Sequence, residues 1–225
     1  MTGEEQPDAL ERRLGEHRYG VALFLTLAVV MFAVSAPDAR WAQAVGIALQ
    51  GTMLVVVIVT SGVRLNERRR MAVLVAVSVT VLVVLIALRD VRQALALGLA
   101  GVLVVAALPT LMRGVARLLR TQGVTIQAVF GALTIYLMLG LLFAFAIGVT
   151  ADLSSAPYFG ADGDGDVSDH VYFSFTSLTT TGFGDLAAAT RFGRGLTVLE
   201  TLLGTIYMVT VIALLVSNLR PGRRG

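Results

Sequence analysis

Residues 176–186 read TSLTTTGFGDL, and this polar stretch lies between two segments apolar enough to cross a bilayer. It carries five hydroxyl side chains, two glycines and one aspartate. Non-helical backbone at membrane depth is tolerated only where it is buried in protein or lines water. The stretch therefore predicts a loop that faces a hydrated path through the membrane.

The composition is that of a membrane protein. The 225 residues are 56% hydrophobic and 15% charged, with a mean hydropathy of +0.80, which is too apolar for a soluble domain of this size. The chain has no cysteine, so disulfides and thiolate metal sites are excluded. We predict an all-α membrane protein, because a helix pairs its backbone groups within one segment and no alternating pattern supports a barrel.

Six apolar runs are long enough to form transmembrane helices of about 20 residues. They cover residues 19–37, 41–63, 71–88, 93–112, 121–151 and 195–219. Short connections join the first four, whereas a long pore loop, residues 152–194, separates the fifth from the sixth. Inside it, the run HVYFSFTSL at 170–178 is too short to cross the membrane and predicts a re-entrant helix, with Ser168 or Asp169 as its N-cap.

The placement of arginine predicts the orientation, because basic residues concentrate in cytoplasmic loops. With alternating spans, the side that holds the N-terminus has thirteen of the 18 basic residues: Arg12, Arg13, Arg18, Arg64, Arg68, Arg69, Arg70, Arg113, Arg117, Arg120, Arg220, Arg223 and Arg224. The other side has Arg40, Arg89, Arg92, Arg191 and Arg194. We therefore expect a multi-pass protein of the cell (plasma) membrane with both termini cytoplasmic.

The four backbone carbonyls of Thr180, Thr181, Gly182 and Phe183, with the Thr180 hydroxyl, could form a ladder of oxygens. They point to one side if alternate residues adopt opposite backbone handedness, and Gly182 and Gly184 make this possible because glycine enters positive φ without a Cβ clash. Such a ladder can replace the water around a monovalent cation. One chain supplies only one wall of it.

The segment YFSFTSLTTTGFGDL, residues 172–186, resembles the pore helix and signature sequence of potassium channels. The resemblance covers roughly residues 124–219 and is specific in its Thr-x-Gly-aromatic-Gly-Asp core. It implies a homotetrameric, potassium-selective pore in which the carbonyls of residues 180–183 and the Thr180 hydroxyl bind potassium. Thr176, Gly184 and Asp185 would then support the filter. The commonest filter has Val and Tyr where this chain has Thr181 and Phe183, which leaves the carbonyl count unchanged.

The resemblance also extends to the last span. Gly204 stands twenty positions after Gly184, where the family has a hinge glycine in its inner helix. The resemblance therefore implies that Gly204 is a gating hinge and that Thr205, Met208 and Ile212 line a water-filled cavity.

Glu200 is the only acidic residue inside an expected span. A carboxylate at that depth is costly unless it is paired, protonated or hydrated. We expect it to support the filter, or to act as a proton-sensitive element, by hydrogen bonding to hydroxyls of the re-entrant helix such as Thr176, Ser177 or Thr179. The alternative is a side chain that reaches the outer interface.

The predicted domains are a cytoplasmic segment (1–18), a four-helix peripheral domain (19–112), an interfacial linker (113–123), a pore domain (124–220) and a cytoplasmic tail (221–225). This layout resembles six-span channels of the voltage-gated-like family. A voltage sensor needs several arginines within its fourth helix. Because residues 93–112 are uncharged, we expect weak or no voltage dependence.

Three other functions remain open. A non-selective monovalent cation channel would use the same loop, and a non-conducting subunit would use it as a plug. The GFGD string at 182–185 also occurs in intramembrane aspartyl proteases, but their chemistry needs a second aspartate on a neighbouring span, and none is present. We therefore expect no enzyme activity, no cofactor, no nucleic-acid partner, and membrane lipid and potassium ions as ligands.

The segment before the re-entrant helix raises the question of a calcium site. Asp162, Asp164 and Asp166 alternate with glycines as in the opening of an EF-hand loop, but Val167 and Phe173 stand where its turn glycine and bidentate glutamate belong. The simplest expectation is a flexible, solvated loop. Another is that these acids, repeated around a tetramer, concentrate cations at the outer mouth.

Overall fold

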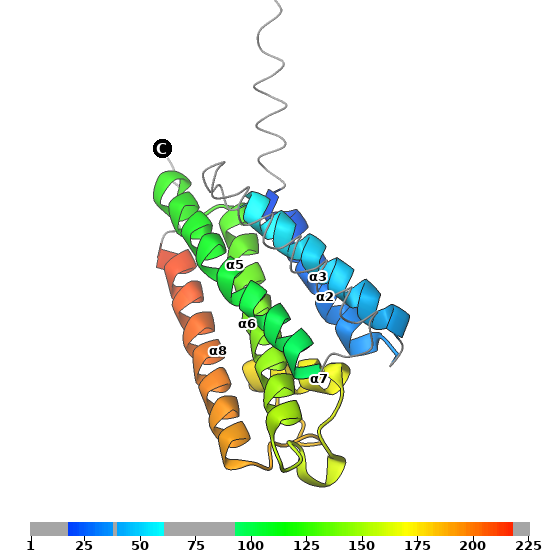
Figure 1. Cartoon of the computed structure of the whole chain (residues 1–225). Helices are drawn as coiled ribbons and strands as arrows, with labels where there is room; N and C mark the ends of the chain where they lie inside the picture. Colours follow the sequence, from blue (N-terminus) through cyan, green and yellow to red (C-terminus); the bar gives the residue numbers. More distant parts are fainter. Residues whose placement is uncertain (1–17, 38–39, 61–92, 218–225) are drawn as a thin grey trace, which may run out of the picture.

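The computed structural model describes residues 18–37, 40–60 and 93–217, and these form an all-helical bundle (Figure 1). Its α-helices are α2 (Arg18–Ser35), α3 (Arg40–Thr60), α5 (Gln93–Gln122), α6 (Ile126–Leu153), α7 (Val167–Leu178) and α8 (Arg191–Ser217), with a short 3-10 turn, η1 (Gly160–Asp162), before α7. The all-α prediction is confirmed for these residues. The expected span at 71–88, nearly all of the N-terminal segment and the tail at 221–225 lie outside the described residues.

Helix α6 is the centre of the bundle. It packs against α5, α2, α7 and α8, and in Figure 1 it runs between α8 on one side and the α2–α3 pair on the other. Leu97, Val104 and Leu111 of α5 are spaced by seven residues, so they lie on one face of that helix, and all three are buried in the core. Their neighbours Ala100 and Ala107 are small, which lets α5 lie close to α6.

The short helix α7 lies directly against α6 because two glycines of α6 leave room for it. A Cβ at Gly140 would lie 2.7 Å from the ring of Phe175, and one at Gly148 would lie 2.8 Å from Nδ1 of His170. A larger residue at either position would push α7 away from the centre of the bundle.

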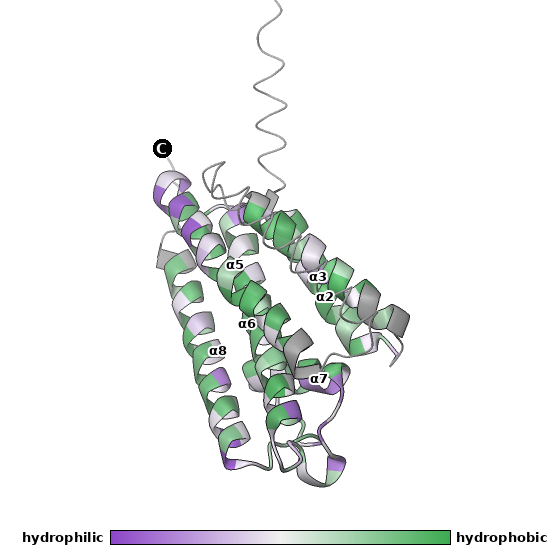
Figure 2. Cartoon of the chain, in the orientation of Figure 1, coloured by the Kyte–Doolittle hydropathy of each residue, from purple (hydrophilic) through white to green (hydrophobic). Residues whose placement is uncertain are grey.

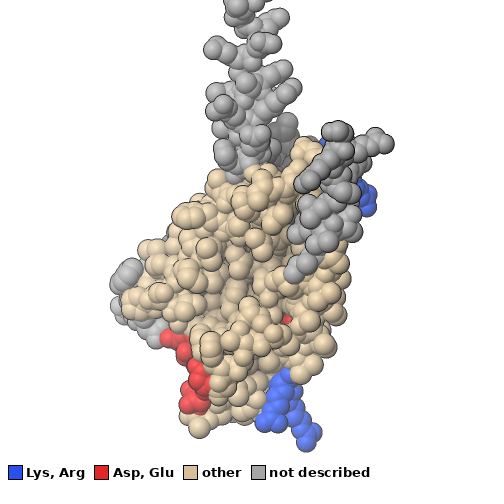
Figure 3. Space-filling model, turned by 180° about the vertical axis from the view of Figure 1, so that it is seen from behind, with Lys and Arg blue, Asp and Glu red and all other residues tan. Residues whose placement is uncertain are grey.

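Two helices are long and apolar enough to cross a membrane by length and composition, Leu97–Gln122 and Ile126–Leu153. Shorter apolar helices cover Tyr19–Ser35 and Val45–Ile58. Figure 2 shows hydrophobic residues along most of the length of the helices, and Figure 3 shows a broad uncharged surface with the charged side chains towards its ends. Helix α7 has 12 residues and a length of about 18 Å, which is too short to cross.

The N-cap prediction for the re-entrant helix is wrong. Helix α7 begins at Val167, and Asp166 is its N-cap. The Asp166 side chain accepts a hydrogen bond from the backbone N–H of Asp169, and the Asp169 carboxylate accepts one from the backbone N–H of Asp166. This reciprocal arrangement satisfies two backbone donors at once, which neither predicted cap would do. Ser168 has another role, since its hydroxyl donates to the carbonyl oxygen of Val34 at the end of α2 (2.7 Å).

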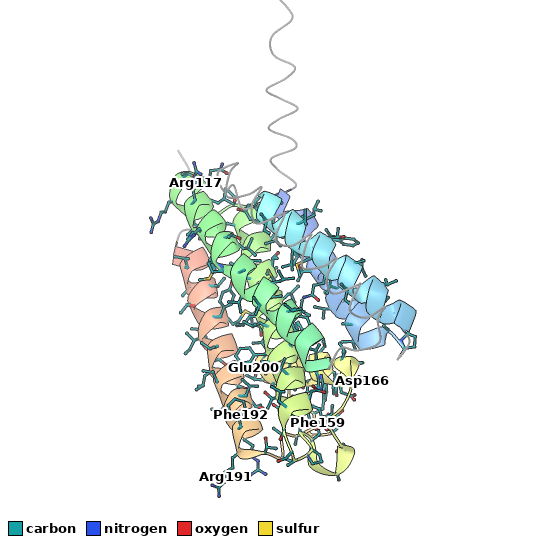
Figure 4. All side chains as sticks on the ribbon, viewed as in Figure 1. Arg117, Phe159, Asp166, Arg191, Phe192 and Glu200 are labelled. Carbon is teal, nitrogen blue, oxygen red and sulfur yellow. The ribbon has the colours of Figure 1, made fainter. Side chains whose placement is uncertain are left out.

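The segment predicted as a separate interfacial linker, residues 113–123, is mostly the last part of α5. The helix continues from Gln93 to Gln122 with Pro109 inside it, and a short turn at Gly123 leads into α6. Arg113, Arg117 and Arg120 are exposed on its final turns, and Figure 4 shows Arg117 at the opposite end of the molecule from Arg191.

Candidate functional site

The candidate site is the chain that leaves the end of α7 and leads to α8. Helix α7 ends at Leu178 with Thr179 as its C-cap, and residues 179–185, the 179–185 loop, are exposed in the single chain. On the other side of α7, an aromatic cluster anchors the preceding segment: Tyr158 and Phe159 pack edge to face against Phe173. The backbone N–H of Ala189 donates to the carbonyl of Tyr158 (2.8 Å), so the segments before α7 and after the loop are tied together.

The backbone of the loop alternates in handedness. The angle φ is positive at Thr180 (59°), Gly182 (51°) and Gly184 (84°), which are alternate residues. Thr180 is the only non-glycine residue with positive φ in the part of the chain that the structure describes. A β-carbon in this conformation costs on the order of 1–2 kcal/mol, so surrounding contacts must hold Thr180 in place.

Those contacts come from the last turn of α7. The backbone N–H groups of Thr181 and Gly182 both donate to the carbonyl of Thr176, at 2.8 and 3.1 Å, and that of Thr180 donates to Ser177 (3.0 Å). The backbone carbonyl of Thr176 thus accepts two hydrogen bonds from the loop. The Thr176 hydroxyl donates within α7, to the carbonyl of Phe173 (3.0 Å).

Two threonine hydroxyls restrain the inner part of the loop. The Thr179 hydroxyl donates to the carbonyl of Phe175 (2.7 Å) and lies 2.9 Å from the Thr181 hydroxyl. A hydroxyl has one proton, so Thr181 is the donor in the second bond. Thr181, one of the two departures from the commonest filter, is thus tied to the end of α7.

Tyr172 holds the outer part of the loop. Its ring stacks on Phe183 with centroids 6.2 Å apart and planes 6° from parallel, and its hydroxyl donates to Asp185 Oδ2 (2.7 Å). This hydrogen bond lowers the pKa of Asp185 from its ordinary value, so the carboxylate form is favoured. Sequence reasoning did not identify Tyr172 as a site residue, although its place in the quoted pore-helix segment was the available signal.

Glu200 contacts α7 through a hydroxyl other than the three named in the sequence analysis. Its side chain on α8 is 0% exposed and lies in hydrogen-bond contact with the hydroxyl of Ser174. The hydroxyls of Thr176 and Thr179 donate instead to backbone carbonyls within α7, those of Phe173 and Phe175. The alternative of a side chain at the outer interface is excluded by this burial, and Figure 4 shows Glu200 within the bundle.

Two tyrosines, one on α6 and one on α8, form hydrogen bonds between the helices around the end of α7. The Tyr136 hydroxyl of α6 donates to the carbonyl of Leu178 (3.1 Å), and the Tyr207 hydroxyl of α8 donates to the carbonyl of Ala132 (2.7 Å). The two tyrosine rings stack at 5.9 Å. These contacts join distant parts of the chain, and sequence reasoning found neither tyrosine.

Gly204 is a close packing contact in this structure. A Cβ there would lie 2.7 Å from both the backbone oxygen and Cδ1 of Leu178, and α8 continues as a helix through this position. Of the residues expected to line a cavity, Thr205 is exposed and Met208 is half-buried. The side chain of Ile212 lies outside the described residues.

The acidic segment before α7 is used for local structure. Asp164 accepts from the backbone N–H of Tyr158 (2.8 Å), and Asp166 caps α7. Within residues 18–37, 40–60 and 93–217, no group of three or more His, Cys, Asp or Glu side chains could hold a metal ion.

Comparison with known proteins identifies one family. Residues 124–220 match the model of a family described as ion channel. This range runs from the turn before α6 through α7, the 179–185 loop and α8, and it covers less than half of the chain. No curated protein and no solved structure matches the chain. The match supports ion-channel function, a transport activity, in a membrane.

Proposed function

We propose that this chain is one subunit of a potassium-selective channel in which four copies place their 179–185 loops around a common axis. The alternating backbone at Thr180, Gly182 and Gly184 is the observation that carries the proposal. Alternation of this kind allows successive carbonyls to face one side, where they replace the hydration shell of an ion. Each chain has one such loop, so a closed ring of copies is needed to surround the ion.

The exposed side chains around the loop support assembly of several copies. Phe183 is 70% exposed on the loop, and α8 carries a run of large exposed apolar residues: Phe192, Val198, Leu199, Leu202, Leu203, Ile206 and Val209. Because the loop and α8 are both uncovered, neighbouring copies can contact them without rearrangement of the chain. In the assembly, potassium is bound by the carbonyls of residues 180–183 and by the Thr180 hydroxyl, and Thr205, Met208 and Ile212 face the cavity below.

The complete chain forms six spans in the cell membrane with both termini in the cytoplasm. The positions of the described arginines support this orientation. Arg113, Arg117 and Arg120 are in the last turns of α5 and Arg191 and Arg194 in the first turn of α8, and Figure 4 shows Arg117 and Arg191 at opposite ends of the molecule. Conduction depends weakly on voltage, because α5 carries its charges only on its last turns. Moving one charge through the field is worth about 2.3 kcal/mol per 100 mV, and steep gating needs several such charges per subunit.

A non-selective monovalent cation channel is the second candidate. Phe183 favours it, because the phenyl ring stacks on Tyr172 but has no hydroxyl with which to restrain the outer part of the loop. A loop with fewer restraints discriminates less between ions of different size. The exposed Asp185 and its tyrosine partner give no support to the aspartyl protease alternative, and we do not propose it.

Reconstitution of the purified chain tests the proposal. In liposomes or planar bilayers with potassium on one side and sodium on the other, we expect a reversal potential close to that of potassium. A potential near zero would favour the non-selective candidate, and absence of current in an assembled protein would favour the non-conducting subunit. The same recordings measure the dependence of conductance on voltage.

A pair of glycine variants distinguishes an effect specific to the 179–185 loop from the general effect of placing alanine at a position with positive φ. Gly184 and Gly163 both have positive φ, and a Cβ at either would meet no atom within 4 Å in the single chain. We expect Gly184→Ala to abolish or strongly reduce potassium selectivity, because the strain falls on the carbonyl ladder. Gly163→Ala carries a similar strain in the segment before α7 and should leave selectivity unchanged.

A further inference from the structure

The hydroxyl of Ser174 lies between two oxygen atoms from different helices. Its Oγ is 2.7 Å from the backbone carbonyl oxygen of Gly140 on α6 and 2.5 Å from Oε1 of Glu200 on α8. Both Ser174 and Glu200 are 0% exposed, so the chain itself encloses this contact whatever its oligomeric state. Three helices, α6, α7 and α8, therefore meet at one hydroxyl.

Two separate, linear hydrogen bonds at these distances use two protons. A serine hydroxyl has one proton, and a backbone carbonyl has none to give. The proton between Ser174 and Gly140 must therefore come from Ser174, and the proton between Ser174 and Glu200 must come from Glu200. If Glu200 were ionised, one of the two oxygen pairs would lie at hydrogen-bond distance with no proton between its atoms.

The surroundings of Glu200 do not favour a negative charge. Its second oxygen, Oε2, is buried and has no hydrogen-bond partner among the described residues. Tyr136 of α6 and Tyr158 of the segment before α7 interact electrostatically with it. Their hydroxyls donate to the backbone carbonyls of Leu178 and Gly193. An ionised carboxyl group would lack both a cation and a second donor in this part of the structure.

Two further titratable groups, one on α7 and one on α8, form hydrogen bonds to backbone carbonyls and not to Glu200. On α7, His170 lies one turn before Ser174, and its Nε2 bonds to the backbone carbonyl of Asp164. On α8, the hydroxyl of Tyr207 donates to the carbonyl of Ala132. No described arginine is among the groups that interact with Glu200. The protonated acid is the form that the local structure can satisfy.

We infer that Glu200 is protonated in the folded protein. Its O–H group donates a hydrogen bond to the hydroxyl oxygen of Ser174, and the Ser174 hydroxyl donates one to the backbone carbonyl of Gly140. This relay fixes α7 to α6 and α8 at the same point, and the 179–185 loop starts one turn further along α7. Glu200 is thus a positioning residue. Any effect of Glu200 on ion conduction rests on the proposed function, whereas the assignment of a proton to Glu200 is independent of that function. Loss of the proton breaks the relay and loosens the support of the loop.

Infrared spectroscopy tests the assignment on the full chain in a detergent without ester groups. At neutral pH, we expect a carbonyl-stretch band of a protonated carboxyl group that is absent from Glu200→Gln and shifted in frequency in Ser174→Ala. Asp185→Asn, which removes an exposed carboxyl group, should leave the band unchanged. If Glu200→Gln removes only carboxylate absorption, Glu200 is ionised and the inference is wrong.

The dependence of thermal unfolding on pH gives a second readout. Glutamine keeps a donor for Ser174 without titrating, so Glu200→Gln should match the wild type in acid, where Glu200 is protonated in both the folded and the unfolded chain. Above about pH 4.3, the ordinary pKa of a glutamate, only the unfolded wild-type chain releases this proton, so the stability of the wild type should fall progressively below that of Glu200→Gln as the pH rises. Identical pH profiles for the two proteins would contradict the inference. Current recordings on the same preparations keep the two questions apart: a protonated Glu200 without ion flux contradicts only the proposed function, and selective flux with an ionised Glu200 contradicts only the inference.

Discussion

At the scale of single residues, the buried imidazole ring of His170 on α7 has one hydrogen-bond partner, and this partner determines which ring nitrogen carries the proton. His170 is 2% exposed, and its Nε2 lies 2.8 Å from the carbonyl oxygen of Asp164, which can only accept, so Nε2 carries the proton. The other ring nitrogen, Nδ1, is buried without a hydrogen-bond partner among the described residues and faces Gly148 of α6. A second proton on the ring would therefore be a buried donor without an acceptor.

This arrangement makes the stability of the protein depend on His170 at mildly acidic pH. Burial lowers the pKa of His170 below its ordinary value of about 6.5, so the unfolded chain binds more protons than the folded one between the two values. The stabilisation is complete above about pH 6.5 and is lost as the pH falls towards the folded pKa. Melting temperatures of wild type and His170→Gln should diverge at neutral pH and converge on acidification. Parallel profiles would show that His170 does not titrate on unfolding.

At the scale of elements, the close crossing of α8 over the end of α7 depends on the absence of a side chain at Gly204. A methyl group there would meet the backbone oxygen of Leu178, which cannot move aside without breaking the end of α7. We expect Gly204→Ala to lower the free energy of unfolding by about 1–3 kcal/mol, the usual cost of overpacking.

A second glycine of the same helix is the matched control. Gly195 is exposed, and a Cβ there would meet nothing within 4 Å, so Gly195→Ala should be neutral or stabilise α8 by up to about 1 kcal/mol. Denaturant or thermal unfolding in detergent measures both variants. Equal stabilities for the two would mean that α8 can shift away from Leu178 at little cost.

The elements themselves could be predicted from local patterns, whereas their contacts could not. Apolar runs and their lengths gave the positions of α2, α3, α5, α6 and α8, because hydrophobic length is set by the bilayer and is visible along the chain. The two loop glycines indicated a backbone with positive φ, and both have it. The unusual conformation of Thr180 carried no such signal, since threonine normally avoids that region.

Partners that are distant in sequence account for most of what was missed. Ser174 meets Glu200, and Tyr136 meets Leu178, only because glycines of α6 bring α7 close to the bundle. Nothing in the local sequence of either pair specifies the other member. The N-cap of α7 was misplaced for a related reason: Asp166 and Asp169 form a reciprocal pair, and either acid or the intervening serine suits the position when taken singly.

At the scale of the whole molecule, the uncovered loop and α8 lead to a prediction about assembly. We expect the purified protein to have the mass of four chains after correction for bound detergent, because a ring of loops is needed to enclose an ion. Light scattering or native mass spectrometry measures this. A monomer or dimer that still conducts potassium would contradict the tetramer.

The hydrogen bond from Ser168 to Val34 bears on how this protein can be divided. It joins the end of α2 to the first turn of α7, and α2 and α5 together cover much of α6. The family match begins at residue 124, after both of these helices. A chimera cut at that boundary would inherit the recognisable pore sequence but strip α6 and α7 of their own scaffold, so a transplantable unit has to include α2 and α5 as well.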